Sequence, residues 1–249
     1  MSKVAKVTAW FWIIKICATT LGETAGDLLS MTLNVGYAVS SMILISLFLV
    51  SLFMQVRSRR FHPVIYWIVI VTTSTAGTTM SDYMNRTLEF GYAKGSLILV
   101  TCLIVVLAVW RFTERTLSVE NIKTTRAELF YWTAILFSNT LGTSLGDFLA
   151  DSSGIGFLGG AALIASLLAL VMIGWRFTRI DRIVLFWIAF VLTRPFGATF
   201  GDLLTKPLAR GGLNFGTIGS SAILAVLLVV FIAYATLQEK RVAGGNTAS

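Results

Sequence analysis

The chain alternates between long apolar runs and short polar connections. Eight of these runs are about twenty residues long, which is enough to cross the hydrocarbon core of a bilayer as an α-helix. We expect them at 7–29, 35–56, 63–84, 91–112, 128–150, 155–175, 183–204 and 214–237. Stretches of alternating polarity, which are typical of membrane barrel strands, are absent from the sequence. The pattern predicts an all-α polytopic membrane protein with eight transmembrane helices.

A short polar phrase recurs near the far end of every odd-numbered run. Its copies span 20–27, 76–82, 141–147 and 196–202, and they end in Asp27, Asp82, Asp147 and Asp202. Each aspartate follows a tryptophan by fifteen residues, and these tryptophans are Trp12, Trp67, Trp132 and Trp187. The recurrence predicts four repeats of two helices each, because a fixed spacing of similar residues marks a repeated structural unit.

The repeats are expected at 7–56, 63–112, 128–175 and 183–237. The first two repeats match the last two with a constant offset of 120 residues, so we divide the single membrane domain into halves at 1–120 and 121–249. Each repeat crosses the membrane twice, and all four therefore enter from the same side. The halves should be related by an axis along the membrane normal, as in transporters with parallel repeats.

Composition supports a membrane protein, and the distribution of charge predicts its orientation. The chain is 56% hydrophobic and 13% charged, whereas soluble domains are about 25% charged. The net charge of +8 does not indicate a nucleic-acid partner, because the basic residues lie mostly in short connections. One side of the membrane carries fourteen of them: Lys3, Lys6, Arg57, Arg59, Arg60, Arg111, Arg115, Lys123, Arg126, Arg176, Arg179, Arg182, Lys240 and Arg241. The other side carries four: Arg86, Lys94, Lys206 and Arg210. We expect a bacterial inner-membrane protein with both termini in the cytoplasm.

All seven tryptophans map near the expected cytoplasmic face, and they are Trp10, Trp12, Trp67, Trp110, Trp132, Trp175 and Trp187. Indole side chains prefer the membrane–water interface, so we interpret them as an interfacial belt. The alternative interpretation is an aromatic cage for an organic cation, which requires several rings around one point.

These features resemble a bacterial membrane-protein family defined by a tandem repeat of unknown function. The resemblance covers residues 4–237 through the tryptophan series and the phrases that end in Gly-Asp or Ser-Asp. It implies four repeats, each with two membrane helices and a characteristic tryptophan, and it implies no particular activity. The phrase at 22–27 also resembles the acidic signatures of exchangers for calcium or manganese, although its Glu23-x-x-Gly26-Asp27 spacing differs from theirs.

Small residues four positions apart occur in every phrase: Gly22 and Gly26, Gly77 and Ser81, Gly142 and Gly146, and Gly197 and Gly201. This spacing places both residues on one helical face, where they allow close approach of a neighbouring backbone within lipid. We therefore expect the first helix of each repeat to lie inside the bundle and the more apolar second helix to lie outside.

The four aspartates are candidate ligands for a cation. Fifteen residues of helix place each aspartate roughly 22 Å from its tryptophan, in the outer half of the membrane. Intramembrane carboxylates usually mark ion or proton routes. Alternatively, each aspartate ends its helix at the interface or caps a new helix after a break. Asp82 and Asp202 have Arg86 and Lys206 four residues later and can pair locally, whereas Asp27 and Asp147 lack such a neighbour.

The first phrase carries further polar residues. Lys15, Thr19, Glu23 and Asp27 follow one another at steps of four and form a polar stripe on one helix. The stripe is either an internal salt bridge from Lys15 to a carboxylate or a proton relay between close carboxylates. Arg194 occupies the equivalent depth in the seventh run and must find a partner there. The five acidic and two basic groups within the runs leave a charge of −3, which favours a cation.

Oxygen ligands select hard cations, and we expect Glu23, Asp27 and Asp147 to be the metal ligands, with Asp82 and Asp202 contributing to substrate binding. Lys15 and Arg194 would act as a proton relay or as charge partners. Catalytic motifs are absent, so we expect neither an enzyme nor a cofactor. The sequence favours a secondary transporter that exchanges a small cation, such as manganese, for protons, and a homo-oligomer is compatible with it. The alternatives are a transporter of small organic cations and a non-transporting scaffold or sensor.

Overall fold

The structure is a computed structural model that describes residues 3–58, 60–122 and 124–245. Its long helices are α1 (Ala9–Asp27), α2 (Tyr37–Arg57), α3 (Pro63–Asp82), α4 (Tyr92–Glu114), α5 (Thr125–Asp147), α6 (Gly156–Phe177), α7 (Arg182–Thr205) and α8 (Thr217–Gly245). Each helix overlaps one of the runs expected from the sequence. Within the described ranges, every long helix except α1 and α5 is apolar enough to cross a membrane. The protein therefore has the helices of a multi-pass membrane protein. Arg59 and Lys123 lie outside the described residues, as do the side chains of Lys240 and Arg241.

The four first helices of the repeats form an inner ring. α1 contacts α3 and α7, and α5 contacts the same two helices, so each inner helix has two inner neighbours. Each outer helix packs most closely on the inner helix of the following repeat: α2 on α3, α4 on α5, and α6 on α7. α8 closes the arrangement by packing on α1. The expected division into inner first helices and outer second helices is confirmed.

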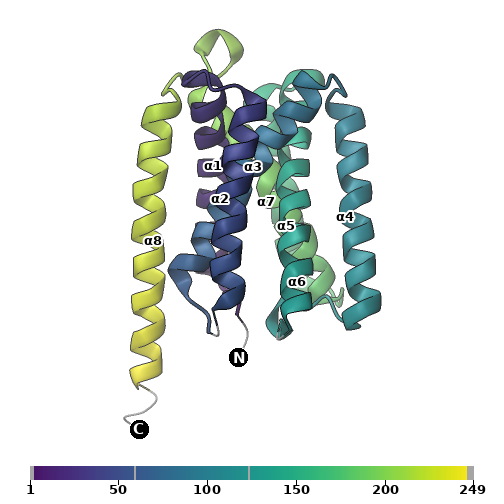
Figure 1. Cartoon of the computed structure of the whole chain (residues 1–249), viewed down its shortest axis with the longest axis vertical. Helices are drawn as coiled ribbons and strands as arrows, with labels where there is room; N and C mark the ends of the chain where they lie inside the picture. The colour runs from purple at the N-terminus through teal and green to yellow at the C-terminus, as the bar shows by residue number, and fades with distance from the viewer. Residues whose placement is uncertain (1–2, 59, 123, 246–249) are drawn as a thin grey trace.

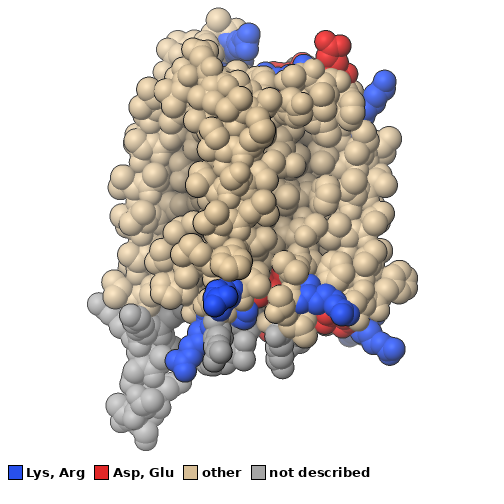
Figure 2. Space-filling view, viewed as in Figure 1, with Lys and Arg blue, Asp and Glu red and all other residues tan. Residues whose placement is uncertain are grey.

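The helices run side by side along the long axis of the molecule, and both termini lie at the same end (Figure 1). α8 extends beyond the other helices at that end. The face shown in Figure 2 has a band without Lys, Arg, Asp or Glu between two ends that carry charged side chains, with Lys and Arg gathered at the end that bears the termini. Outer-helix residues such as Phe53 and Leu97 leave about two thirds of their surface exposed, at 65% and 67%. This surface suits contact with lipid.

The chain continues in helical form past three of the four aspartates. After Asp27, Asp82 and Asp147 the chain makes one π-helical turn, over Leu28–Thr32, Tyr83–Thr87 and Phe148–Ser152. These aspartates have right-handed helical backbone angles, and their side chains make no capping hydrogen bond. The alternative that they cap a new helix after a break is therefore wrong, because there is no break.

The outer helices begin at or just after a glycine in every repeat. Gly36, Gly91, Gly156 and Gly216 have φ between 69° and 80°. A side chain would strain the backbone in this left-handed region, which explains why glycine occupies all four positions. The fourth repeat differs in sequence by having Thr217 after its glycine, yet it turns with the same backbone geometry.

The tryptophans form an aromatic layer inside the bundle, and the prediction of an interfacial belt is wrong for most of them. Trp67, Trp110, Trp132 and Trp187 expose 6% or less of their surface, and only Trp175 is largely exposed. Each repeat has an aromatic residue directly before its tryptophan, and these pairs pack edge to face, as Tyr66 does on Trp67 at 5.2 Å. The hydroxyls of Tyr66 and Tyr131 are hydrogen-bonded at 2.6 Å. The layer therefore closes the inner ring at the end that bears the termini.

Candidate cation-binding site

The inner helices approach one another through the first glycine of each phrase. A Cβ atom on Gly22 would lie 2.2 Å from Ser74 Oγ of the next inner helix. The same relation repeats around the ring, with Gly77 against Asn139, Gly142 against Arg194 and Gly197 against Thr19. All of these distances are 3.0 Å or shorter, which is below van der Waals contact. The packing role expected for these glycines is confirmed.

The second small residue of each phrase is packed as closely, one turn further along. A Cβ atom would meet Thr78 at 2.8 Å from Gly26, Ala198 at 2.8 Å from Gly146, and Glu23 at 3.0 Å from Gly201. Ser81 takes the corresponding place in α3, is fully buried, and accepts a hydrogen bond from Asn85 at 3.1 Å. The close approach fixes which side chains face the axis of the ring, because little room remains elsewhere.

Glu23 and Arg194 form a buried ion pair that joins all four inner helices. Arg194 Nη1 donates to Glu23 Oε2 at 2.9 Å. The hydroxyls of Thr78 in α3 and Thr143 in α5 donate to the same oxygen at 3.3 and 3.2 Å. Arg194 Nη2 also donates to Thr78 Oγ1 at 2.5 Å and to the carbonyl of Ser74 at 3.3 Å. The sequence predicted that Arg194 acts either in a proton relay or as a charge partner. The ion pair places it as the charge partner of Glu23.

The aspartates are paired within and between helices. The expected local pairs are confirmed, with Asp82 at 2.9 Å from Arg86 and Asp202 at 3.0 Å from Lys206. Asp27 has no basic neighbour four residues later, yet it is also paired, because Lys206 reaches it at 2.5 Å across the α1–α7 contact. Asp147 likewise lies 3.7 Å from Arg86 of the neighbouring inner helix.

Lys206, which follows the last residue of α7, remains a cation in this setting. Burial alone lowers the pKa of its ammonium group, but the carboxylates of Asp202 and Asp27 outweigh this effect and raise the pKa above the ordinary lysine value. Arg86 plays the matching role between Asp82 and Asp147. Each base therefore bridges two aspartates on different inner helices.

Three carboxylates converge at the end of the ring away from the termini. Glu23, Asp147 and Asp202 each offer an oxygen atom, and these atoms lie within 4.8 Å of one another. All three side chains are buried, with 4% or less of each residue exposed. Asp147 Oδ2 accepts no hydrogen bond from the described residues. Asp202 stands in this set instead of Asp27, which differs from the metal ligands expected from the sequence.

Lys15 has no carboxylate partner among the residues that the structure describes, so the interpretation of an internal salt bridge is wrong. Its Nζ atom lies 3.8 Å from the ring centre of Phe190 and makes no hydrogen bond there. The side chain is completely buried. The reason is geometric: Glu23 turns toward Arg194 and is two helical turns away from Lys15, roughly 12 Å along the axis.

The charge balance around the carboxylates also differs from the expected −3. Arg86 and Lys206 join Lys15 and Arg194, so five carboxylates face four basic groups. The preference for a cation therefore depends on the local convergence of Glu23, Asp147 and Asp202 and not on the overall charge.

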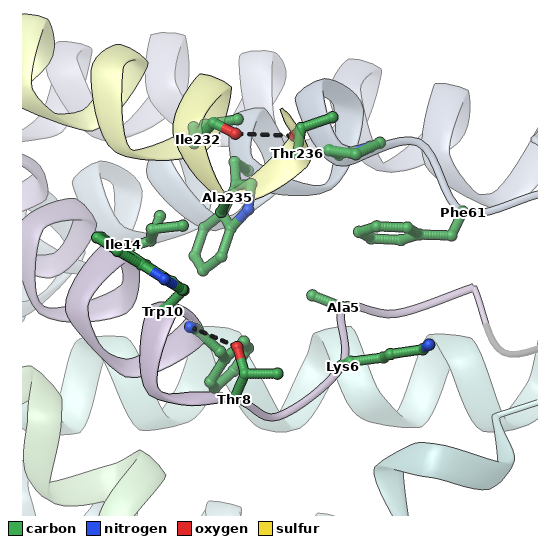
Figure 3. A pocket seen from close by; sticks show the side chains of 12 residues that line it. Ala5, Lys6, Thr8, Trp10, Ile14, Phe61, Ile232, Ala235 and Thr236 are labelled. Carbon is green, nitrogen blue, oxygen red and sulfur yellow. Dashed lines mark hydrogen bonds between the residues drawn. The ribbon is translucent and has the colours of Figure 1, made fainter. Parts of the chain in front are cut away.

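A separate hollow lies at the opposite end, near the termini (Figure 3). It is lined by residues such as Lys6, Trp10, Phe61 and Ala235, from the segment before α1, from α1 itself, from the connection before α3 and from α8. Among the described residues, the lining of this hollow contains no carboxylate. This hollow is therefore distinct from the carboxylate cluster.

Four tandem matches to one family model cover most of the chain, at residues 10–61, 65–116, 130–181 and 185–241. That model is described as Repeat of Unknown Function (DUF347). The chain belongs to this family. The four DUF347 matches coincide with the four helix pairs α1–α2, α3–α4, α5–α6 and α7–α8. The resemblance stated from the tryptophan series is confirmed, and each DUF347 repeat contributes one inner and one outer helix. Searches of curated proteins and of solved structures found no match to the chain.

The bridging bases and the threonine donors are the site residues that the sequence did not reveal. Arg86 and Lys206 stood out only as local partners, yet they also link neighbouring repeats. Thr78 and Thr143 occupy the position that Glu23 takes in the first repeat, one residue after the first glycine. An alignment of the four DUF347 repeats could have indicated these residues, because equivalent positions of the repeats meet at the same level of the ring.

Proposed function

We propose that the protein is a secondary transporter of the bacterial inner membrane that exchanges a small, hard cation for protons. We also propose that the chain crosses the membrane eight times and that both termini lie in the cytoplasm. The observation that carries it is the convergence of Glu23, Asp147 and Asp202 in a buried position. Three ionised carboxylates this close repel one another strongly where water is scarce. The cluster is relieved by bound protons or by a bound cation, and competition between the two is the basis of exchange.

The ligand chemistry favours a hard divalent ion such as Mn²⁺, Mg²⁺ or Ca²⁺. Carboxylate oxygens and threonine hydroxyls surround the cluster, and such ions prefer oxygen ligands. The aromatic layer closes the ring at the other end, so the cation reaches the cluster from the side opposite the termini. The buried tryptophans pack on other aromatic rings and do not favour the alternative of an organic-cation cage.

Cation binding is expected to stabilise the purified protein against heat. A ligand at about 100 times its Kd stabilises the native state by about 2.7 kcal/mol, so the melting temperature should rise with MnCl₂, MgCl₂ or CaCl₂. Asp147→Asn removes one ligand charge from the cluster and should abolish most of the shift. A fluorescence-based melting curve in detergent measures both proteins.

Asp151→Asn is the matched control, because Asp151 lies one turn further along the same segment with its side chain 49% exposed. This variant should keep the full shift. A wild-type protein whose melting temperature responds to none of these ions would contradict a divalent-cation site, and an unchanged shift in Asp147→Asn would exclude Asp147 from it.

The orientation has its own test. The end that bears the termini carries the gathered Lys and Arg side chains, which supports a cytoplasmic position for that end (Figure 2). A cysteine introduced at Gly211, in the α7–α8 connection, should react with a membrane-impermeant maleimide in intact spheroplasts. A cysteine at Arg179, in the α6–α7 connection, should react only after lysis. The reverse pattern would invert the proposed topology.

The second candidate is a membrane scaffold or sensor without transport. The observation that favours it is the pairing of Arg86 and Lys206 with aspartates of two repeats each, since such pairs also serve to hold helices together. It predicts that Asp147→Asn lowers the melting temperature without changing any response to ions. The melting experiment above therefore separates the two candidates.

A further inference from the structure

Unpaired polar atoms are concentrated in the middle of the inner ring. Within the described part of the chain, Thr73 Oγ1, Ser74 Oγ, Ser138 Oγ, both amide atoms of Asn139 and Arg194 Nε are buried without a hydrogen-bond partner. They lie at two consecutive positions of the repeat, on three of the four inner helices. Buried polar groups in proteins normally pair with protein atoms or ordered water. This level of the ring therefore offers a row of unpaired donors and acceptors that can pass on a proton.

Lys15 lies at one end of this polar level. It comes from α1, the inner helix that contributes none of the unpaired atoms above, and its own Nζ is also without a hydrogen bond. Glu23, held by Arg194, lies at the other end, toward the carboxylate cluster. The polar level thus connects a buried amine with the layer that contains the candidate cation site.

The surroundings of Lys15 contain little to hold a fixed positive charge. The charged group that acts on it is Arg194 of α7, which carries the same sign. Phe190 of α7 provides a ring face 3.8 Å from Nζ. A single cation–π contact compensates only part of the cost of burying a charge, so the ring alone does not hold Lys15 in its charged form. On α3 and α5 the Tyr66 and Tyr131 hydroxyls bond to each other; on α1 itself Cys17 donates to a carbonyl of α8.

We propose that Lys15 is the proton-binding site that couples proton movement to the cation site. This inference rests on the proposed function and names a residue outside the carboxylate cluster that binds a proton during exchange. The neutral amine accepts a proton on Nζ from the unpaired polar groups at the Ser74–Asn139 level, and it returns that proton to them when it is deprotonated. The positive charge of a protonated Lys15 opposes a second positive charge at the cluster that contains Glu23, so the proton and the cation bind in opposition, as exchange requires. The charge on Lys15 and the binding of a cation at the cluster therefore depend on each other.

The test uses the full-length protein in liposomes with a MnCl₂ gradient. A pH-sensitive dye inside the vesicles measures proton counterflow, and the Mn²⁺-induced melting shift measures binding separately. Lys15→Met keeps an unbranched chain of similar size but cannot bind a proton. We expect its proton counterflow to fall about tenfold or more, while the Mn²⁺-induced melting shift is retained. Ile135→Met, at the equivalent position of α5, is the matched control and should retain both.

Proton counterflow at the wild-type rate in Lys15→Met would overturn the inference and leave the proposed function standing. A wild-type protein that neither binds nor moves Mn²⁺, Mg²⁺ or Ca²⁺ would overturn the proposed function, and the inference with it. If Lys15→Met does not fold, Asn139→Leu removes both unpaired amide atoms and leaves Lys15 in place. It should lose proton counterflow to a similar extent, and normal counterflow in Asn139→Leu would overturn the inference.

Discussion

Arg194→Met should be among the most destabilising single substitutions in this protein. It leaves Glu23 buried with two threonine hydroxyls and no counter-ion, and breaking a buried ion pair costs about 3–5 kcal/mol. We expect a large loss of monodisperse protein in size-exclusion chromatography and a much lower melting temperature for the remainder. Arg179→Met, in the exposed α6–α7 connection, is the control and should behave like the wild type.

The double variant Glu23→Gln/Arg194→Met distinguishes a charge effect from a packing effect. Removing both charges avoids the uncompensated carboxylate, so the double variant should recover most of the stability lost in Arg194→Met. A double variant as unstable as the single one would mean that the packing of the arginine side chain against Gly142 and Thr78, and not its charge, stabilises the ring.

Gly142→Ala should be the second large effect, although it adds only one methyl group. The added Cβ would lie 2.3 Å from Arg194 Cγ and 3.0 Å from the backbone carbonyl carbon of Arg194, so α5 and α7 must separate. Overpacking of this kind costs about 1–3 kcal/mol, and it would also shift the guanidinium away from Glu23. Thermal unfolding in detergent measures the loss.

Gly174→Ala in α6 is the matched control. Its Cβ would meet only Leu185 Cδ2, at 3.9 Å, which is ordinary van der Waals contact. Alanine is a better helix former than glycine by about 1 kcal/mol, so this variant should be slightly more stable than the wild type. Equal effects of the two substitutions would contradict the close helix contact at Gly142.

The arrangement of the helices could be predicted from the sequence because each unit repeats the same physical pattern. The small residues at 22, 77, 142 and 197 indicated which helices touch, and the apolar second helices indicated which face lipid. The aromatic layer could not be recognised from tryptophan alone, since indole suits both the interface and a buried ring contact. The aromatic residue before each tryptophan, such as Tyr66 or Tyr131, was the better indication of an inward-facing pair.

The ion pairs show where sequence reasoning reaches its limit. Spacing along one helix predicts a pair such as Asp82 with Arg86, because residues four apart share a face. It does not predict that Lys206 also reaches Asp27, or that Asp202 rather than Asp27 joins Glu23 and Asp147. These contacts depend on the relative height of neighbouring helices, which is determined by tertiary packing.

The contact between α8 and α1 has a consequence for the ancestry of the fold. Each repeat offers an outer helix to the next repeat and receives one from the previous repeat, and the last repeat returns its outer helix to the first. Such a closed ring does not require a single polypeptide. Two copies of a half-length chain, or four copies of one helix pair, would close it with the same contacts. The contacts between neighbouring repeats therefore have the same geometry as the subunit interfaces of a symmetric oligomer. Because the four repeats are parts of one chain, they can differ at equivalent positions, so Glu23 and Arg194 come from different repeats and meet at a point where a symmetric assembly would place four identical charges.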